Sequence, residues 1–152
     1  MFYSKKLKNF KNIKHCFFSR HGGFSKGLYK GLNCGRGSKD KKENILRNLN
    51  YVSKRMFVKK NKLILMNQTH SNKVVEIKKN NFKKKINSDA IITRTQEFAL
   101  GVVTADCVPI LLYDKKNEIV GCIHAGWKGA LSGIIKNTVK KKDSNKIWTH
   151  DL

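Results

Sequence analysis

Short apolar runs in the second half of the chain constrain its fold more than any other sequence feature. The run Phe98–Ala105 is apolar on both alternating faces, which is typical of a buried central strand. Two further runs, Pro109–Asp114 and Glu118–His124, flank the polar tripeptide Lys115–Asn117 and predict a β-hairpin. Strands are also expected over residues 13–19, 62–70, 74–77 and 90–93, and a glycine-rich loop follows the first of them.

Two segments have helical periodicity. Residues 40–51 and the next position place Ile45, Leu46, Leu49 and Val52 at near-helical spacing, with Ser38 or Asp40 as the N-cap. A second helix is expected over residues 127–142, ending in lysines that suit the negative end of a helix dipole. Its apolar stripe would consist of Leu131, Ile134, Ile135 and Thr138. Strands mixed with helices predict an α/β (mixed α+β) fold, a layered sandwich of mixed β-sheets with helices packed outside.

The length and composition indicate one cytoplasmic domain over residues 1–152. No apolar run approaches the roughly 18 residues that cross a bilayer, and the lysine-rich N-terminus lacks the apolar region of a signal peptide. No C-x-x-C pair occurs, so reduced thiols are expected at Cys16, Cys34, Cys107 and Cys122.

The formal net charge of +23 raises the alternative of a basic nucleic-acid-binding module. The excess is mostly lysine, however, with 28 lysines and 5 arginines. Proteins that read bases or clamp phosphates lean more on arginine, whose planar fork makes bidentate contacts. The composition therefore favours a solvated lysine surface and disfavours a nucleic-acid partner.

Three residues of metal-binding type, His70, Cys107 and His124, each follow an apolar strand-like run. Thiolate and imidazole are ligands that Zn²⁺ prefers, and three protein ligands leave a fourth position open, as in catalytic sites. Spacing alone also allows a buried core thiol and hydrogen-bonded loop histidines. The pattern is compatible with copper as well, because Cu²⁺ outranks Zn²⁺ in intrinsic affinity.

The sequence motifs around these residues resemble those of a known family. The words Gln68–His70, Thr104–Pro109 and His124–Gly129 occur in this order, after Ser19–Gly23 near the N-terminus. This combination resembles the multicopper polyphenol oxidase, or laccase-like, family, whose members are now assigned to purine nucleoside metabolism. The resemblance runs from about Phe17 to Val139.

The resemblance implies a zinc-binding triad of His70, Cys107 and His124 in a mixed α/β fold. It further implies phosphorolysis of adenosine, inosine, guanosine and methylthioadenosine, with adenosine deamination, so purine nucleosides and inorganic phosphate are the expected partners. A homodimer is left open. A four-copper oxidase would need about ten histidines, commonly in H-x-H pairs, and this chain has five histidines and no such pair. A single-copper oxidase remains an alternative.

Further residues suit the implied reactions. In deamination, water activated by zinc would attack adenine, and Asp106 is the nearest acid that could protonate the leaving ammonia, or it could only orient a ligand. Phosphorolysis needs cationic groups for phosphate, for which Arg20 is the first candidate and Lys128, at an expected helix N-terminus, the second. Asn33 either lines the pocket or forms an Asx turn.

Two departures from the family pattern stand out. The helix that should contain Glu-Asn-Arg reads Glu43-Asn44-Ile45, so the arginine is missing or displaced to Arg47. Family members continue for roughly another third of a full-length chain, and residues 140–152 do not resemble that continuation. We therefore expect a domain that is incomplete at its C-terminus, and an inactive truncated fragment is a third alternative.

Overall fold

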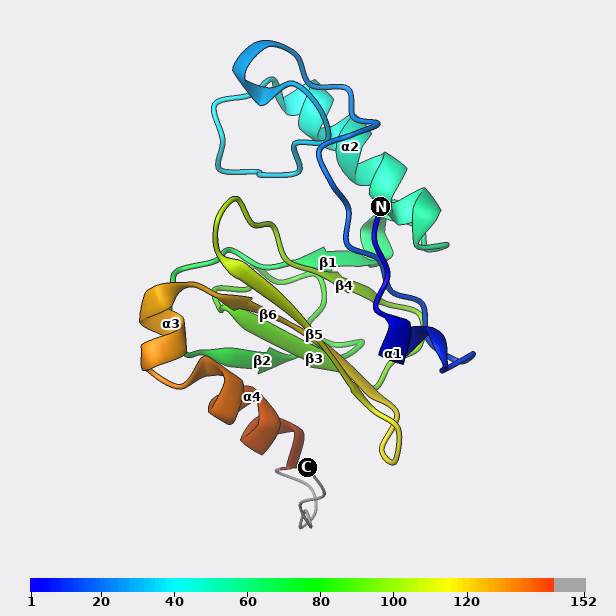
Figure 1. The fold of residues 1–152 in the computed structure, drawn as a ribbon, viewed down its shortest axis with the longest axis vertical. Coiled ribbons are helices and arrows are strands. Elements are labelled where there is room, and N and C mark those ends of the chain that lie inside the picture. Colours follow the sequence, from blue (N-terminus) through cyan, green and yellow to red (C-terminus); the bar gives the residue numbers. More distant parts are fainter. Residues whose placement is uncertain (144–152) are drawn as a thin grey trace. The chain divides into compact units, whose positions relative to one another are not determined.

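The computed structural model describes residues 1–143 and divides the chain into two compact units (Figure 1). The first unit is Met1–Leu63, and the second begins at Ile64. Each unit is described by itself below. The expectation of one domain over residues 1–152 stays a prediction.

The first unit is built around one long helix, α2 (Lys42–Arg55), which confirms the helix expected over residues 40–51. Ile45 and Leu49 form its buried stripe, whereas Leu46, expected on the same apolar face, is exposed. The predicted N-cap is wrong: Lys41 occupies that position without a side-chain cap, because the Asp40 carboxylate binds the Lys41 N–H and other side chains instead. The remaining elements are short, namely α1 (Lys5–Lys8) and the 3₁₀ turns η1 (Gly27–Tyr29) and η2 (Lys60–Lys62).

The glycine-rich segment before α2 is a loop, as predicted, and it folds onto Asn48. The fully buried Asn48 amide donates to Ser25 Oγ (2.9 Å) and to the Asn33 carbonyl (2.7 Å). Gly31, with φ of +118°, passes so close to the Arg20 carbonyl that a Cβ atom there would lie 2.2 Å from it. The strand predicted over residues 13–19 is wrong, because the backbone of this stretch makes only an isolated bridge between Phe17 and Phe2.

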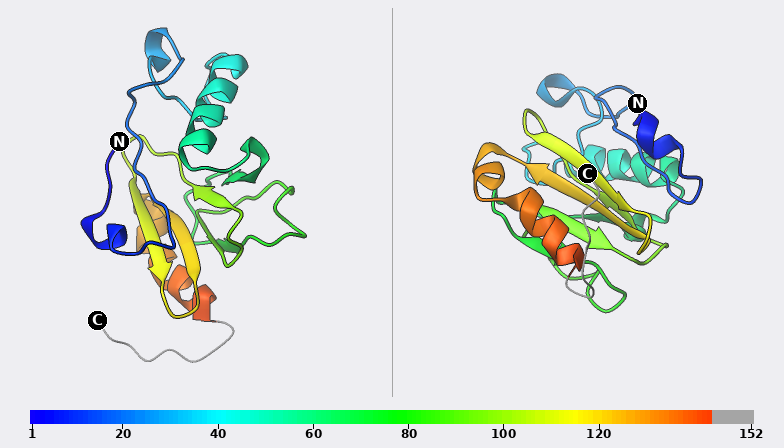
Figure 2. Two further views of the ribbon diagram at one scale, coloured as in Figure 1. Left: turned by 90° about the vertical axis from the view of Figure 1, so that its right-hand side faces the viewer. Right: turned by 60° about the horizontal axis from the view of Figure 1, so that its bottom comes forward.

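The second unit contains a four-stranded mixed sheet in the order β2-β3-β6-β5 (Figure 1). Strands β2 and β3 are parallel, whereas β6 is antiparallel to both β3 and β5. Strands β5 and β6 form the predicted hairpin around residues 115–118, seen from two sides in Figure 2. The strands are β2 (Val74–Glu76), β3 (Ala90–Thr93), β5 (Val108–Asp114) and β6 (Ile119–Ala125).

This sheet is buried on both faces because successive residues of its strands point to opposite sides. Ala90 and Ile123 pack with Ile134 of helix α4 (Ile134–Asp143) on one face. The neighbouring residues Ile91 and Cys122 pack on the other face, against Ile64, Met66, Ile77 and Phe98. The sheet therefore forms the middle of a layered arrangement.

A small second sheet, β1 (Leu63–Leu65) with β4 (Ala99–Gly101), contributes to the second of these faces. The prediction of a long central strand over Phe98–Ala105 is wrong. Strand β4 ends at Gly101 because the Gln68 side chain takes both backbone groups of Val103, accepting its N–H (2.9 Å) and donating to its carbonyl (2.8 Å).

The single C-terminal helix predicted from the sequence is two helices, α3 (Trp127–Leu131) and α4. The break lies at Gly133, whose φ of +83° is in the left-handed region. Because of it, only half of the predicted apolar stripe is confirmed: Ile134 and Thr138 are fully buried, but Leu131 and Ile135 are 82% and 45% exposed.

Helices α3 and α4 lie on the same side of the four-stranded sheet (Figure 1). Helix α4 contacts β2, β3 and β6, and α3 contacts β6. The predicted mixed α/β architecture, with mixed strands and outer helices, is confirmed. Within residues 1–143, no helix has the length and apolar character needed to span a bilayer.

Candidate metal centre

The predicted ligands come together at the end of the β5–β6 hairpin opposite its turn. His124 lies inside β6, one residue before the strand ends, and Cys107 directly precedes β5. The register pairs Pro109 with His124, which brings Cys107 to the same end of the sheet. His70 lies in the loop after β1 with a left-handed φ of 57°. The expectation that all three ligands follow strands is thus wrong in detail, since only His70 comes from a loop after its strand.

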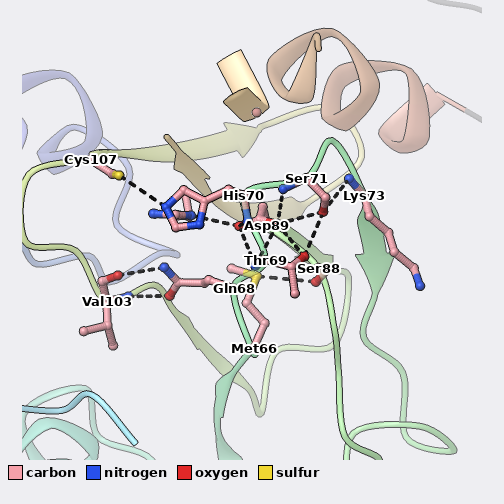
Figure 3. A network of polar contacts seen from close by, with 12 residues as sticks. Met66, Gln68, Thr69, His70, Ser71, Lys73, Ser88, Asp89, Val103 and Cys107 are labelled. Atoms are coloured by element: carbon pink, nitrogen blue, oxygen red, sulfur yellow. Dashed lines mark hydrogen bonds and ion pairs between the residues drawn. The ribbon is translucent and has the colours of Figure 1, made fainter. Parts of the chain in front are cut away.

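The ligand atoms of His70, Cys107 and His124 all lie within 4.8 Å of one another. Cys107 Sγ is 3.9 Å from His70 Nε2, as drawn in Figure 3. The two imidazole rings meet edge to face, with centroids 4.9 Å apart and an interplanar angle of 79°. His124 is buried and His70 is exposed, so the three donors line a site that is open on one side.

This donor set fits a tetrahedral zinc ion. Zn–S bonds of about 2.3 Å and Zn–N bonds of about 2.0 Å place sulfur and nitrogen ligands about 3.5 Å apart. The separation of Cys107 Sγ and His70 Nε2 exceeds this by only a few tenths of an ångström. Because His70 is exposed, a small rotation of its side chain would close the difference.

A buried carboxylate, Asp89, lies directly behind the ligands. Asp89 Oδ1 is 2.8 Å from His124 Nδ1, and the residue has no exposed surface. Its two oxygens also accept hydrogen bonds from the backbone N–H groups of Thr69, His70 and Ser71, at 2.7 to 3.2 Å. The hydroxyls of Thr69 (3.1 Å) and Ser71 (2.7 Å) complete this shell, shown in Figure 3.

These contacts determine the charge of the two acidic groups at the site. Burial opposes ionisation of Asp89, but the hydrogen bonds from His124, Ser71 and the Thr69 backbone outweigh it and lower its pKa to about 2. For Cys107, desolvation and the neighbouring Asp106 carboxylate raise the pKa of the thiol. A metal binding there would displace the thiol proton.

Gly126 allows the site to be this compact. A Cβ atom at this position would lie 2.7 Å from His70 Cδ2 and 3.3 Å from Cys107 Sγ. The glycine follows β6 directly and is the N-cap of α3. The absence of a side chain is therefore required by close approach of two ligands.

Two further predicted residues lie near the ligands in sequence and are exposed. Asp106 shares the bend at residues 105–107 with Cys107 and interacts with its thiol. Neither residue is in a strand, so the alternation of side chains along a strand does not place them on opposite faces. Lys128 Nζ lies over the Trp127 ring, 5.3 Å from its centroid, and both residues belong to α3, which is only five residues long.

Arg20 and Asn33 belong to the first unit and are described by their own contacts. Arg20 is exposed, and its Nη2 donates to the Lys30 carbonyl (2.9 Å). Asn33 forms the Asx turn considered above, accepting the Gly35 N–H (3.0 Å), and its amide donates to Ser38 and Asp40. Phosphate or substrate binding by these residues stays a prediction.

Sequence reasoning missed Asp89 and assigned no role to Gln68 beyond its motif. A signal for Asp89 was present: the chain has only 10 acidic residues, and this one directly precedes the fully buried strand β3. A carboxylate at such a position must find hydrogen-bond donors when the strand is buried.

Comparison with known proteins decides the family. The model of the family described as multi-copper polyphenol oxidoreductase laccase matches residues 14–151. The chain belongs to this family. The match to the laccase family extends to residue 151, so the expected end of the resemblance at Val139 is wrong.

Curated relatives in the laccase family carry the name purine nucleoside phosphorylase. The protein of that name from Bacteroides thetaiotaomicron is 33% identical over 145 residues, covering 90% of this chain and 54% of the relative. One from Corynebacterium glutamicum is 32% identical, covering 86% and 54%. The chain thus spans about half the length of these relatives.

Solved structures show the same fold. A Neisseria meningitidis protein matches with a TM-score of 0.74 and 32% identity, over 82% of this chain and 50% of its own. YlmD from Geobacillus stearothermophilus matches with a TM-score of 0.78 and 25% identity, over 82% and 49%.

Proposed function

We propose that this chain binds zinc through His70, Cys107 and His124 and acts on purine nucleosides. The proposed reactions are phosphorolysis of adenosine, inosine, guanosine and methylthioadenosine, with deamination of adenosine as a second activity. The observation that carries the proposal is the convergence of one sulfur and two nitrogen donors within 4.8 Å. Relatives named purine nucleoside phosphorylase support the substrate class.

Each residue of the site has a distinct role in this proposal. His70, Cys107 and His124 hold the ion, and the exposed side of the cluster receives the substrate. Bound zinc would supply Lewis acidity there. Asp106, exposed beside the Cys107 thiol, is the proposed general acid for the leaving group. Arg20, Asn33 and Lys128 are the proposed phosphate and substrate residues, from sequence reasoning.

In phosphorolysis, the phosphate oxygen forms a bond to the anomeric carbon as the bond from that carbon to the purine nitrogen breaks. The products are the free base and a sugar 1-phosphate, and the base needs a proton at the nitrogen that leaves. Cationic side chains stabilise the phosphate, so Lys128 and Arg20 suit this step by charge. Cytoplasmic location and a homodimer stay predictions.

Replacement of Cys107 by serine tests the proposal. Purified wild-type chain should contain about one zinc per molecule and release hypoxanthine from inosine only when phosphate is present. Cys107→Ser should lose both properties, because serine offers no thiolate. Cys16→Ser is the matched control, since Cys16 is half-buried and lies outside the ligand cluster.

Zinc-loaded, folded wild-type protein that cleaves none of the four nucleosides would contradict the proposed substrate class. Folded protein without zinc affinity would contradict the metal site itself. Binding to polyanions that weakens steeply with salt and ignores Cys107→Ser would instead favour the nucleic-acid-binding alternative.

A further inference from the structure

We propose that Asp89 is the positioning residue of the metal centre, which aligns both histidine ligands through one buried carboxylate. This inference rests on the proposed metal site and adds a residue to it. Two sets of Asp89 contacts, called arms below, support this inference: one to the His124 ring and one to the backbone that bears His70.

The first arm fixes the His124 imidazole. Asp89 Oδ1 lies 2.8 Å from His124 Nδ1, and both residues are buried, with relative side-chain exposures of 0% and 4%. An ionised carboxylate only accepts hydrogen bonds, so Nδ1 must carry the hydrogen. The other ring nitrogen, Nε2, is then left with its lone pair for a metal, the arrangement found when a carboxylate supports a metal-binding histidine.

The backbone reinforces this first arm. The His124 N–H donates to the Asp89 carbonyl at 2.7 Å, which extends the pairing of β3 and β6 by one step beyond Ala90. The side-chain contact is therefore made between neighbours already aligned across the sheet. Little freedom remains for the ring.

The second arm fixes the loop that presents His70. Three consecutive backbone N–H groups, at Thr69, His70 and Ser71, point at the Asp89 carboxylate. Successive N–H groups of this kind form an anion-binding concavity, which here is filled by a side chain of the same chain. His70 keeps its left-handed φ of 57° within this loop. The carboxylate thus stabilises the backbone conformation that turns the His70 ring toward Cys107.

A carboxylate with a purely structural role would make the same buried contacts. The test must therefore distinguish stabilisation of the fold from alignment of the metal ligands. Asp89→Asn keeps the size of the side chain and removes its charge. We expect the Kd for Zn²⁺, measured by competition with a chromophoric chelator, to rise about 10- to 100-fold. Ser88→Ala is the matched control, because Ser88 is equally buried beside Asp89 but its hydroxyl donates to Met66 Sδ (3.4 Å) and not to a ligand residue.

The tautomer of His124 supplies a second measurement that does not depend on a variant folding. In metal-free wild-type chain labelled with ¹⁵N-histidine, the neutral His124 ring should carry its proton on Nδ1. A proton on Nε2, or Asp89→Asn binding zinc within twofold of the wild-type Kd, would overturn the proposal. Absence of nucleoside turnover would count against the proposed substrates and leave both of these measurements intact.

Discussion

The lack of a side chain at position 126 is a condition for the ligand cluster. A Cβ atom there would come closer to His70 Cδ2, at 2.7 Å, than packed carbon atoms allow. The atom that it meets belongs to an exposed histidine, which can rotate away. An added methyl group is therefore accommodated by moving a ligand and not by opening the fold.

Gly126→Ala should consequently weaken zinc binding without destabilising the protein. Metal sites need ligands held within about 0.5 Å of their working positions. We expect a roughly 10-fold or greater rise in the zinc Kd, with an unchanged urea unfolding midpoint for the metal-free chain. Gly37→Ala is the control, because a Cβ atom at Gly37 would meet nothing within 4 Å. A variant that binds zinc normally but unfolds earlier would contradict this account.

At the scale of single residues, the sequence predicts which side chains could bind a metal, but it does not predict the contacts that hold those side chains in place. His70, Cys107 and His124 are of metal-binding type wherever they occur, so the sequence alone made them candidates. Asp89 acquires its role only through contact with a residue 35 positions away. No local pattern records such a contact.

Among the elements, the break between α3 and α4 shows what periodicity alone misses. Helical spacing over residues 127–142 continues through Gly133, and it put Ile134 and Ile135 on one apolar stripe. The left-handed turn at Gly133 restarts the helix with a different face toward the sheet. Ile134 consequently packs with Ala90 and Ile123, whereas Ile135 faces outward.

Adjacent isoleucines therefore provide a matched pair of variants. Ile134→Ala should lower the free energy of unfolding by about 2–5 kcal/mol, the range for emptying a buried aliphatic site. Ile135→Ala should change it by no more than about 0.5 kcal/mol. Urea denaturation followed by circular dichroism would measure both. Equal losses at the two positions would mean that one continuous helix is present, as the periodicity first predicted.

Among the strands, too, one feature could be predicted from the sequence and another could not. The β5–β6 hairpin could be predicted because a polar turn between two apolar runs is a local signal. The end of β4 could not, because a side chain from residue 68 replaces the strand that would have paired with Val103. When a side chain from a distant residue takes the hydrogen bonds of a strand's backbone, nothing in the sequence of that strand indicates it.

For the whole molecule, the net charge of +23 is the dominant electrostatic fact. The chain has 33 basic residues and only 10 acidic residues. One of these acidic groups, the Asp89 carboxylate, already interacts with an imidazole and with backbone amide groups, so it neutralises none of the surface lysines. Self-repulsion of like charges opposes compaction, and dissolved salt screens it.

Thermal stability should therefore rise with ionic strength. We expect the Tm to increase between about 10 mM and about 150 mM NaCl, as the Debye length falls from about 30 Å to about 8 Å. Differential scanning fluorimetry would follow the change. Acetylation of surface lysines removes their charge and should flatten the dependence. A Tm that falls with salt would indicate that attractive ion pairs, and not repulsion, control stability.

The distances along the chain between the ligands have a consequence for the metal itself. His70 and Cys107 are 37 positions apart, and His124 lies 17 positions farther on. In an unfolded chain, loops of this length give the ligands a low effective concentration, so the disordered polypeptide is a poor chelator. Zinc would then bind almost exclusively to folded molecules and, at 100 times its Kd, shift the folding equilibrium by about 2.7 kcal/mol. Metal occupancy would report how much of a preparation is folded.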